Sequence, residues 1–293
     1  MAIHLEEVKQ GFAARVTGID LKQTPSEDDV AAINAAILKF PVLVFPEAKI
    51  TDQQQAAFAS HFGPLQYATG YTQGPSDGRL DRVMTDSSNI GTDDKTFQRG
   101  DRRRMNLLGS RRWHTDGSYK KIPAKISFLQ AHVVPEKGGE TQFADMQGAY
   151  ESFPPELKEL IDGLVVEHSL IHSRKATGFE NPLTDHPDVL PVIHQRLVRR
   201  HPDTGRRSVY VSSHASHIVD WPLPEGLDLL YELTDRATKP EFVYTHKWTV
   251  GDVVMWDNRV TMHRVLRHYP EDAPRDLRRT SVEDNAPTLE QVA

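Results

Sequence analysis

Residues 113–119, WHTDGSY, place a histidine and an aspartate two positions apart between two aromatic residues. In an extended chain, side chains two apart point to the same side, so His114 and Asp116 can bind one metal ion from the end of a strand. An iron(II) site that leaves positions open for substrate and oxygen typically uses two histidines and one carboxylate. The motif therefore predicts two of three metal ligands.

The chain has 14 histidines, so chance His-x-Asp triplets are expected, and two others occur at 186–188 and 201–203. Both have proline as the spacer and lie among turn-forming residues, so both are predicted to be loops. In WHTDGSY the spacer is threonine, and Gly117 allows a sharp turn after the aspartate. A surface hydrogen bond or a cap remains the usual role of an isolated His-x-Asp, so the interpretation depends on a third ligand.

The best candidate for that ligand is His263, in the segment DVVMWDNRVTMHRV at 252–265. An apolar strand is predicted at the start of this segment, and the chain then bends at Asp-Asn-Arg before it reaches the histidine. His194 and His246 lie inside strand patterns, where hydrogen bonding within a sheet is the simpler role.

Arginines near the carboxyl end suit a dicarboxylate cosubstrate of such an iron, because a guanidinium binds a carboxylate through two hydrogen bonds and keeps its charge. In PRDLRRTSV, Arg275 and Arg279 share one face of a predicted strand and Arg278 points away. The alternative for each is a solvated surface arginine.

The loop-like segment 99–112 is also rich in arginine, and it could steer anions toward the iron. A solvated or subunit-contacting loop is the alternative. The arginines in question are Arg99, Arg102, Arg103, Arg104, Arg111 and Arg112.

Two helices with apolar spacing are predicted before the motif, at 26–40 and 51–63, and the second opens with Thr51 and Gln54 at capping-box distance. From about 68 to 112, little periodicity is left and long loops are expected.

The rest of the chain is mostly short β-branched or aromatic runs separated by turns, with helical patterns at 147–163 and 225–239. We expect one domain over residues 1–293, mainly β with flanking helices, of the barrel or double-sheet jelly-roll type.

Composition narrows the function further. The absence of cysteine excludes disulfides, thiolate zinc sites and iron–sulfur clusters, so any metal must be bound by His, Asp or Glu. The net charge of -6 disfavours a nucleic-acid-binding protein. The sequence has neither a signal peptide pattern nor an apolar run of membrane-spanning length, so a cytoplasmic enzyme without a membrane partner is expected.

Together these motifs resemble those of the iron(II)- and 2-oxoglutarate-dependent dioxygenases of the taurine dioxygenase and 2,4-dichlorophenoxyacetate dioxygenase family. The resemblance runs from VTGIDL at 16–21 to RDLRRTSV at 275–282, and WHTDGSY, GGETQFADM and the WDNR before the distal histidine carry it. HASH, VYTHKW and RDLRR are most similar to the phenoxyacetate branch. The family fold that this implies is a double-stranded β-helix, a jelly roll.

The resemblance also implies ligands. His114, Asp116 and His263 match the residues that bind Fe(II). Thr141 matches a threonine that hydrogen-bonds a carboxylate of the cosubstrate 2-oxoglutarate, and Arg275 matches the arginine that pairs with its far carboxylate. Dioxygen is the second cosubstrate.

For the primary substrate, the resemblance implies that Arg279 faces an anionic group. His214 and His217, in SSHASHI, could line the same pocket. Ser110 stands where an asparagine is usual, and Ala68 stands where taurine-specific members have a histidine, so taurine itself is disfavoured.

One spacing departs from the family pattern. Arg275 comes twelve residues after His263 instead of the usual eleven, which indicates an extra residue in HYPEDAP at 268–274. If the local register is shifted, Arg278 would take the place of Arg275.

The function expected is hydroxylation of a small anionic substrate, foremost a phenoxyacetate that is cleaved to a phenol and glyoxylate. A sulfonate, an alkyl sulfate or another carboxylate is the alternative within the family. A non-catalytic jelly roll with structural zinc is a rival from another class, disfavoured because such sites normally have four ligands. Assembly into a homo-oligomer is left open.

Overall fold

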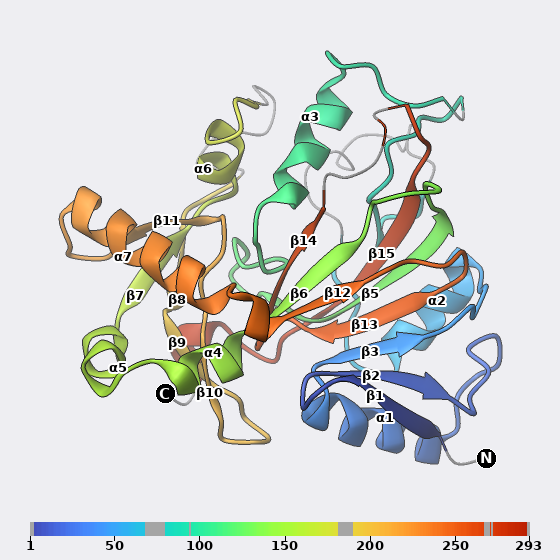
Figure 1. The fold of residues 1–293 in the computed structure, drawn as a ribbon, viewed down its shortest axis with the longest axis horizontal. Helices are drawn as coiled ribbons and strands as arrows, with labels where there is room; N and C mark the ends of the chain where they lie inside the picture. The colour runs from blue at the N-terminus through green and yellow to red at the C-terminus, as the bar shows by residue number, and fades with distance from the viewer. Residues whose placement is uncertain are drawn as a thin grey trace.

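The computed structural model describes residues 3–67, 80–93, 95–180, 190–266, 270 and 272–291, which form helices around several sheets (Figure 1). The strands are β1 (His4–Lys9), β2 (Ala13–Thr17), β3 (Val42–Phe45), β4 (Met84–Asp86), β5 (Ala124–Val133), β6 (Thr141–Asp145), β7 (Val165–His168), β8 (Ile193–Arg196), β9 (Val198–Arg200), β10 (Arg207–Val209), β11 (Ala215–Ile218), β12 (Val243–His246), β13 (Val253–Asp257), β14 (Thr261–Val265) and β15 (Asp276–Glu283). The α-helices are α1 (Glu27–Lys39), α2 (Asp52–Ser60), α3 (Arg102–Leu108), α4 (Met146–Ser152), α5 (Pro155–Ile161), α6 (Leu170–Lys175) and α7 (Leu223–Ala237), and the short 3-10 helices are η1 (Gly109–Arg111), η2 (Pro240–Phe242) and η3 (Thr288–Glu290).

The largest sheet has seven strands in the order β1-β2-β3-β13-β5-β15-β4. Its central strands alternate apolar side chains between two buried faces, because successive residues of a strand point to opposite sides. In β13, Val253 and Met255 pack on one side, whereas Val254 and Trp256 pack on the other. Both faces of this sheet are therefore covered.

Helices α1 and α2 cover the first face. Ile33 and Ile37 of α1 and Phe58 of α2 pack with Phe128 of β5 in one hydrophobic core. Each helix begins with a capping box, from Ser26 in α1 and from Thr51 in α2, which satisfies exposed backbone amides. Figure 1 shows both helices beside this sheet at the lower right.

A three-stranded antiparallel sheet, β12-β6-β14, lies against the other face. Phe143 of β6 packs in one core with Leu129 of β5 and Trp256 of β13, and its ring lies 5.4 Å from that of Trp256. This sheet carries His263 in β14 and Thr141 at the start of β6. The candidate ligands therefore lie between two sheets that face each other.

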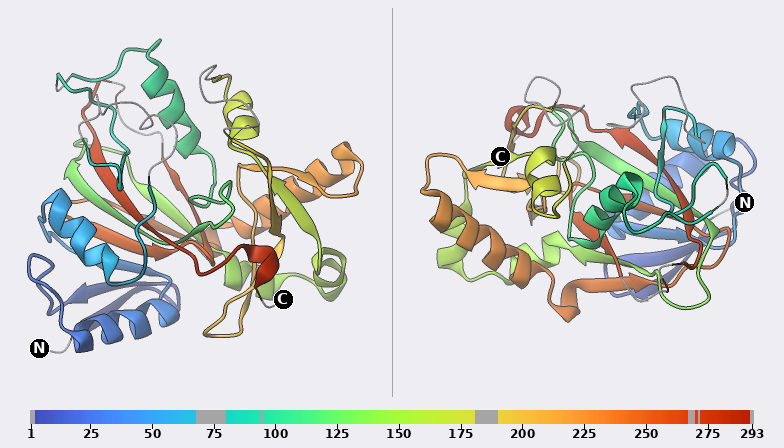
Figure 2. Two further views of the ribbon diagram at one scale, coloured as in Figure 1. Left: turned by 180° about the vertical axis from the view of Figure 1, so that it is seen from behind. Right: turned by 90° about the horizontal axis from the view of Figure 1, so that it is seen from above.

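The remaining elements form a third core, to which Met262 of β14 belongs. The sheet β11-β7-β8 and the hairpin β10-β9 pack with α4, α5 and α7 through Val166, Leu197, Ile218 and Leu233, among others. Figure 1 and the left view of Figure 2 show α3 and α6 at the top of the molecule, away from α1 near its lower end.

The structure confirms most predicted elements and corrects several. The helical pattern at 147–163 is two helices, α4 and α5, and the strand β4 lies within the segment that was expected to be loops. The segment 102–108, expected to be a loop, is the helix α3, and Asp101 caps it by accepting a hydrogen bond from the amide of Arg103. The run LVVEHSLIH at 164–172 is one of the β-branched runs expected to be strands, but only Val165–His168 is β7, and α6 begins at Leu170. Ser169 caps that helix, which explains why the strand stops there.

Two sequence predictions fall outside the described residues: the loop position of Ala68, and the triplet of His186 and Asp188. The other proline triplet is confirmed as a turn between β9 and β10. However, His201 is buried there and its Nε2 lies 3.2 Å from Asp257 Oδ2. It is part of the core, not of an exposed loop.

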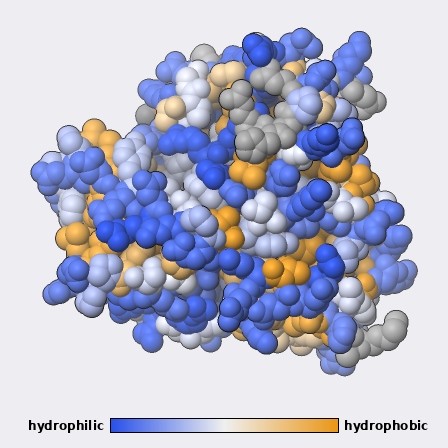
Figure 3. Space-filling view, viewed as in Figure 1, coloured by the Kyte–Doolittle hydropathy of each residue, from blue (hydrophilic) through white to orange (hydrophobic). Residues whose placement is uncertain are grey.

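Among the described residues, no helix is long and apolar enough to cross a membrane. The face of the molecule in Figure 3 is largely hydrophilic, with hydrophobic residues in small separate patches. Neither observation tests self-association, which stays a prediction.

Candidate active site

His114 and His263 are brought together by an isolated antiparallel bridge. The amide of His114 donates to the carbonyl of His263 at 3.0 Å, and the amide of His263 donates back at 2.8 Å. Residues directly opposite each other in an antiparallel pair project to the same face. The two imidazole rings consequently lie side by side, with their centroids 4.1 Å apart.

Asp116 follows two residues later, in a turn and not on a continued strand as we expected. Its carboxylate Oδ1 lies 3.9 Å from Nε2 of His114 and 3.8 Å from Nε2 of His263. Gly117 makes the turn possible: its φ is +63°, and a Cβ there would lie 3.0 Å from the backbone nitrogen of Ala124. The three side chains thus converge from two distant segments.

The protonation states favour metal binding. Burial lowers the pKa of His114, and burial lowers the pKa of His263 well below its usual value, so both rings are neutral near pH 7. Burial opposes ionisation of Asp116, but Arg279, the two histidines and a hydrogen bond from Ser127 outweigh it and lower the pKa of Asp116 to about 2. Neutral imidazoles and an ionised carboxylate are the forms that bind metal ions.

The hydrogen bonds leave Nε2 of His114 available to bind a metal ion. Nδ1 of His114 lies 2.9 Å from the carbonyl oxygen of Arg112, which can only accept, so Nδ1 carries the proton and Nε2 keeps its lone pair. The buried Nδ1 of His263 has no hydrogen-bond partner among the described residues. The Nε2–Oδ1 separations are too long for direct hydrogen bonds.

In the described part of the chain, only these three residues form such a cluster, with ligand atoms within 4.8 Å of one another, and they fit a single iron(II) ion.

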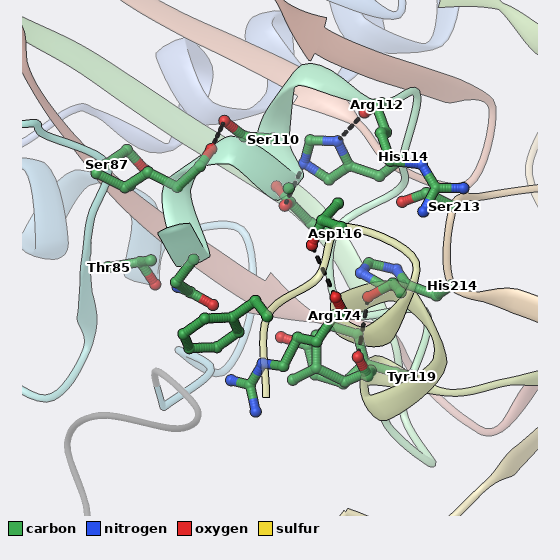
Figure 4. A pocket seen from close by; sticks show the side chains of 18 of the residues that line it. Thr85, Ser87, Ser110, Arg112, His114, Asp116, Tyr119, Arg174, Ser213 and His214 are labelled. Carbon is green, nitrogen blue, oxygen red and sulfur yellow. Dashed lines mark hydrogen bonds and ion pairs between the residues drawn. The ribbon is translucent and has the colours of Figure 1, made fainter. Parts of the chain in front are cut away.

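A cavity of about 160 Å³ opens beside the triad, and Figure 4 shows the side chains that line it. His114, Asp116 and Arg279 line it on the side of the triad, and further charged side chains line it elsewhere, among them Arg112 and Arg174. Its other walls include the apolar or aromatic side chains of Leu107, Tyr119, Leu170 and Phe179. Such a mixture suits a small molecule with one charged end.

Arg279 lies where an anion in this cavity would meet it, but its Nη1 also pairs directly with Oδ1 of Asp116. The sequence did not predict this contact. Its buried Nε has no hydrogen-bond partner among the described residues. The guanidinium therefore contributes positive charge both to the carboxylate and to the cavity.

His214 and Ser110 also line the cavity, whereas His217 does not: it lies in β11, paired with Glu167 of β7. Nδ1 of His214 lies 3.0 Å from Oγ of Ser118, and its ring lies 4.8 Å from that of Tyr119. Ser110 donates its hydroxyl proton to the carbonyl of Leu107 at 2.6 Å, so its oxygen remains available as an acceptor.

Arg275 lies in a second, smaller cavity of about 40 Å³, which shares Ser87 and Ser110 with the first. Its Nε donates to the carbonyl of Gly139 at 3.3 Å. Arg278 points elsewhere, and it pairs with Asp52 at 2.7 Å and with Asp276 at 2.8 Å. The opposite orientation of Arg275 and Arg278 follows the alternation expected from the sequence.

Thr141 is buried at the start of β6, two residues beyond Gly139, and outside the residues that line either cavity. Its hydroxyl oxygen accepts a hydrogen bond from the indole nitrogen of Trp248 at 3.0 Å. Because the indole can only donate, the Thr141 proton remains available to another acceptor. Trp248 was quoted in the sequence motif VYTHKW, but no role was predicted for it.

Half of the six arginines in the segment 99–112 line one of the two cavities. Arg104 and Arg111 line the smaller cavity and Arg112 lines the larger one. Arg103 pairs with Asp101 at 2.9 Å and stacks on Phe97. The expected anion-steering role stays a prediction for those that face the cavities.

Sequence reasoning missed the residues behind Asp116. Ser127 of β5 donates to its Oδ2 at 2.8 Å, and the side chain of Asn258 accepts from its amide at 3.2 Å. Asn258 lies in the WDNR motif, which was the available signal. Ser127 gave none, because a serine inside an apolar strand does not indicate its partner.

Two histidines and a carboxylate beside a cavity with an arginine define the class of mononuclear metal oxygenases with three protein ligands. Comparison with known proteins identifies the family within this class. Residues 4–281 match the family described as taurine catabolism dioxygenase TauD, TfdA family. The chain belongs to this family of 2-oxoglutarate-dependent dioxygenases, whose cofactor is Fe(II).

Curated relatives include the alpha-ketoglutarate-dependent 2,4-dichlorophenoxyacetate dioxygenase of Cupriavidus pinatubonensis, which is 39% identical over 276 residues, or 94% of this chain and 96% of that protein. The (S)-phenoxypropionate/alpha-ketoglutarate-dioxygenase of Sphingobium herbicidovorans is 35% identical over 265 residues, or 86% and 85%. A crystal structure of AAD-2 in complex with Mn(II) and N-oxalylglycine matches with a TM-score of 0.90 and 43% identity, and covers 99% of this chain and 100% of that one.

Proposed function

We propose that this enzyme hydroxylates a small carboxylate substrate of the phenoxyacetate type and that His114, Asp116 and His263 hold its iron. The observation that carries the proposal is the cavity that places a cationic side chain, Arg279, next to the His-Asp-His cluster. Bound Fe(II) supplies the oxidation in which 2-oxoglutarate and O₂ become succinate and CO₂ while a C–H bond of the substrate becomes C–OH.

Arg275 and Thr141 are the proposed ligands of 2-oxoglutarate. Arg275 offers a permanently charged fork for the far carboxylate from the smaller cavity. Thr141 offers a hydroxyl proton, which Trp248 directs by occupying the oxygen. The metal-proximal end of the same molecule would then extend toward the three iron ligands.

Arg279, His214 and Ser110 are the proposed contacts of the primary substrate. A carboxylate near Arg279 would place the adjacent carbon beside the triad, and the apolar wall formed by Leu170 and Phe179 suits an aromatic ring. The cavity is small against the roughly 300–1,000 Å³ of sites for drug-sized ligands. Its small volume and the positive charge of Arg279 favour a small anion.

A phenoxyacetate fits this description and the names of the relatives. Hydroxylation of the carbon between the ether oxygen and the carboxylate gives a hemiacetal. The hemiacetal loses its ether bond, the hydroxyl proton passes to the departing oxygen, and a phenol and glyoxylate result. A sulfonate, an alkyl sulfate or another carboxylate is the alternative, because each presents an anion to Arg279 and uses the same iron.

A non-catalytic zinc jelly roll is disfavoured, because the described residues supply three ligands and not four. The facing sheets with their two cores support a double-stranded β-helix, and we propose that residues 1–293 form one such domain. A cytoplasmic location and the absence of nucleic-acid partners stay predictions from the sequence.

The test is to load the purified protein with Fe(II) and 2-oxoglutarate without oxygen, admit oxygen, and measure succinate with phenoxyacetates, sulfonates and alkyl sulfates. Among the three substrate classes, phenoxyacetates should cause the largest formation of succinate. One phenol should be released for each succinate formed. Strong turnover of a sulfonate or sulfate and none of any phenoxyacetate would overturn the substrate assignment but leave the family unaffected.

A further inference from the structure

The two oxygens of the Asp116 carboxylate have different surroundings. Oδ1 faces the two imidazoles, at 3.9 Å and 3.8 Å from their Nε2 atoms, and it also pairs with Nη1 of Arg279. Oδ2 faces away from them and accepts a hydrogen bond from Oγ of Ser127 at 2.8 Å. Asp116 and Ser127 are both buried. Only one oxygen is thus presented to the metal position.

Asn258 fixes this arrangement from behind. Its Oδ1 accepts from the amide of Asp116 at 3.2 Å and from the indole nitrogen of Trp256 at 3.0 Å. Both of those groups can only donate, so this atom must be the amide oxygen and the other must be the NH₂ group. That NH₂ group donates to Oγ of Ser127 at 2.9 Å.

The proton of Ser127 is directed toward Asp116 by these contacts. Its oxygen already accepts from Asn258, which cannot accept in return, and it lies 3.0 Å from Oγ of Ser281. Ser281 can donate its own proton to Ser127, whereas an ionised carboxylate can only accept. The charge-assisted bond to Asp116 is therefore the stronger use of the single Ser127 proton.

We propose that Ser127 and Asn258 are positioning residues that hold Asp116 as a one-oxygen metal ligand. A carboxylate free to rotate could bind with both oxygens and occupy a coordination position that 2-oxoglutarate or oxygen requires. The bond to Oδ2 prevents this, and the bond to the amide fixes the backbone from which the carboxylate extends. This inference rests on the proposed function.

The experiment compares Ser127→Ala with Ser208→Ala by anaerobic titration with Co(II). Ser208 is the matched control, because it is a buried serine that donates 2.9 Å to the carbonyl of Arg259 and does not contact Asp116. Loss of a group that orients a metal ligand typically weakens binding about 10–100-fold. We expect Ser127→Ala to weaken Co(II) binding by about that factor and Ser208→Ala to weaken it by less than about threefold. The melting temperatures of the two variants should fall by similar amounts.

The visible spectrum of bound Co(II) gives a second readout, because it responds to the number and geometry of ligands. It should change in Ser127→Ala and stay unchanged in Ser208→Ala. Asn258→Ala should weaken Co(II) binding less in the Ser127→Ala background than in the wild type, because part of its effect passes through Ser127. Fully additive losses would contradict that route.

The outcomes separate the two proposals. A wild-type protein that binds no Co(II) would overturn the metal site itself. A wild type that binds tightly, with Ser127→Ala indistinguishable from Ser208→Ala in affinity and spectrum, would overturn only the positioning role.

Discussion

Arg275 and Arg278 are three residues apart, yet their side chains have different partners. Arg275 is buried beside Gly139 and lines the smaller cavity, whereas Arg278 is paired with Asp52 and Asp276 on the other side. We expect Arg275→Ala to raise the KM for 2-oxoglutarate roughly 10–100-fold, because hydrogen bonds to charged groups are worth about 1.5–3 kcal/mol.

The matched control is Arg278→Ala, assayed by succinate formation over a range of 2-oxoglutarate concentrations. It should leave that KM within about twofold and act mainly on stability, because its ion pairs lie away from the cavities. If Arg278→Ala raised the KM and Arg275→Ala did not, the register assigned to this strand would be wrong.

At the scale of single residues, the His-Asp-His cluster was predictable because the types and the order of its residues carry the signal, although His263 is distant in the chain. A His-x-Asp with a small spacer, and a distal histidine after an apolar strand, need only the residue types and their order. The contacts of Ser127 and Asn258 were not predictable, because they depend on how β5 and β13 are paired. The ion pair of Arg279 with Asp116 has the same origin, since it joins residues far apart in the chain.

At the scale of elements, capped helices and alternating strands were predicted well. The capping box of Thr51 was predicted, and the structure has it; the capping box of Ser26 was not predicted, although it is equally local. The helix α3 was missed because it buries none of its residues, so it lacks the apolar stripe on which such predictions depend. The two glycines before β6 were noted only as part of the motif GGETQFADM, and the contact of their turn with Arg275 was not predicted.

Gly139 in that turn is the element-level test. Its φ is +77°, and a Cβ would lie 2.9 Å from Pro135 and 3.3 Å from Nε of Arg275. We expect Gly139→Ala to lower the free energy of unfolding by about 1–2 kcal/mol, the usual penalty of the left-handed conformation, and to raise the KM for 2-oxoglutarate.

Urea unfolding and succinate assays would check both effects. Gly163→Ala is the control, since Gly163 has a φ of +79° but nothing within 4 Å of its added Cβ. Gly163→Ala should lower the free energy of unfolding by a similar amount and leave the KM for 2-oxoglutarate unchanged. Equal KM values in the two variants would contradict the proposed link between this turn and Arg275.

At the scale of the whole molecule, a buried cluster of charged residues connects two segments that are distant in the chain. Nη2 of Arg259 contacts Asp257 Oδ2 at 2.6 Å, and His201 contacts the same oxygen at 3.2 Å. Burial opposes the charge on Asp257, but Arg259 and His201 outweigh it and lower the pKa of that carboxyl far below its usual value. This cluster joins the turn after β9 to the end of β13.

A lowered pKa in the folded state makes stability depend on pH. The contribution of Asp257 is present above its unfolded pKa of about 3.9 and is lost as pH falls below that value toward the folded pKa. The free energy of unfolding should therefore fall below about pH 4, with a slope of up to about 1.4 kcal/mol per pH unit from this group.

Urea unfolding between pH 7 and pH 3 measures that slope. Asp257→Asn should reduce it and destabilise the protein by about 3–5 kcal/mol at pH 7, because Arg259 loses its buried partner. Asp203→Asn is the control, since the side chain of Asp203 is 56% exposed and lies 3.8 Å from Arg259. It should cost less than about 1 kcal/mol. An unchanged slope in Asp257→Asn would rule out this source of acid sensitivity.

The measurement that tests the central claim most directly is an anaerobic Fe(II) titration of the wild type and of His263→Ala, with bound iron counted per chain. His194→Ala is the control, because the side chain of His194 is 49% exposed and lies outside the cluster. We predict one tightly bound ion in the wild type and in His194→Ala, and no tight binding or 2-oxoglutarate turnover in His263→Ala. Full iron binding and full turnover in His263→Ala would contradict the assignment of the triad.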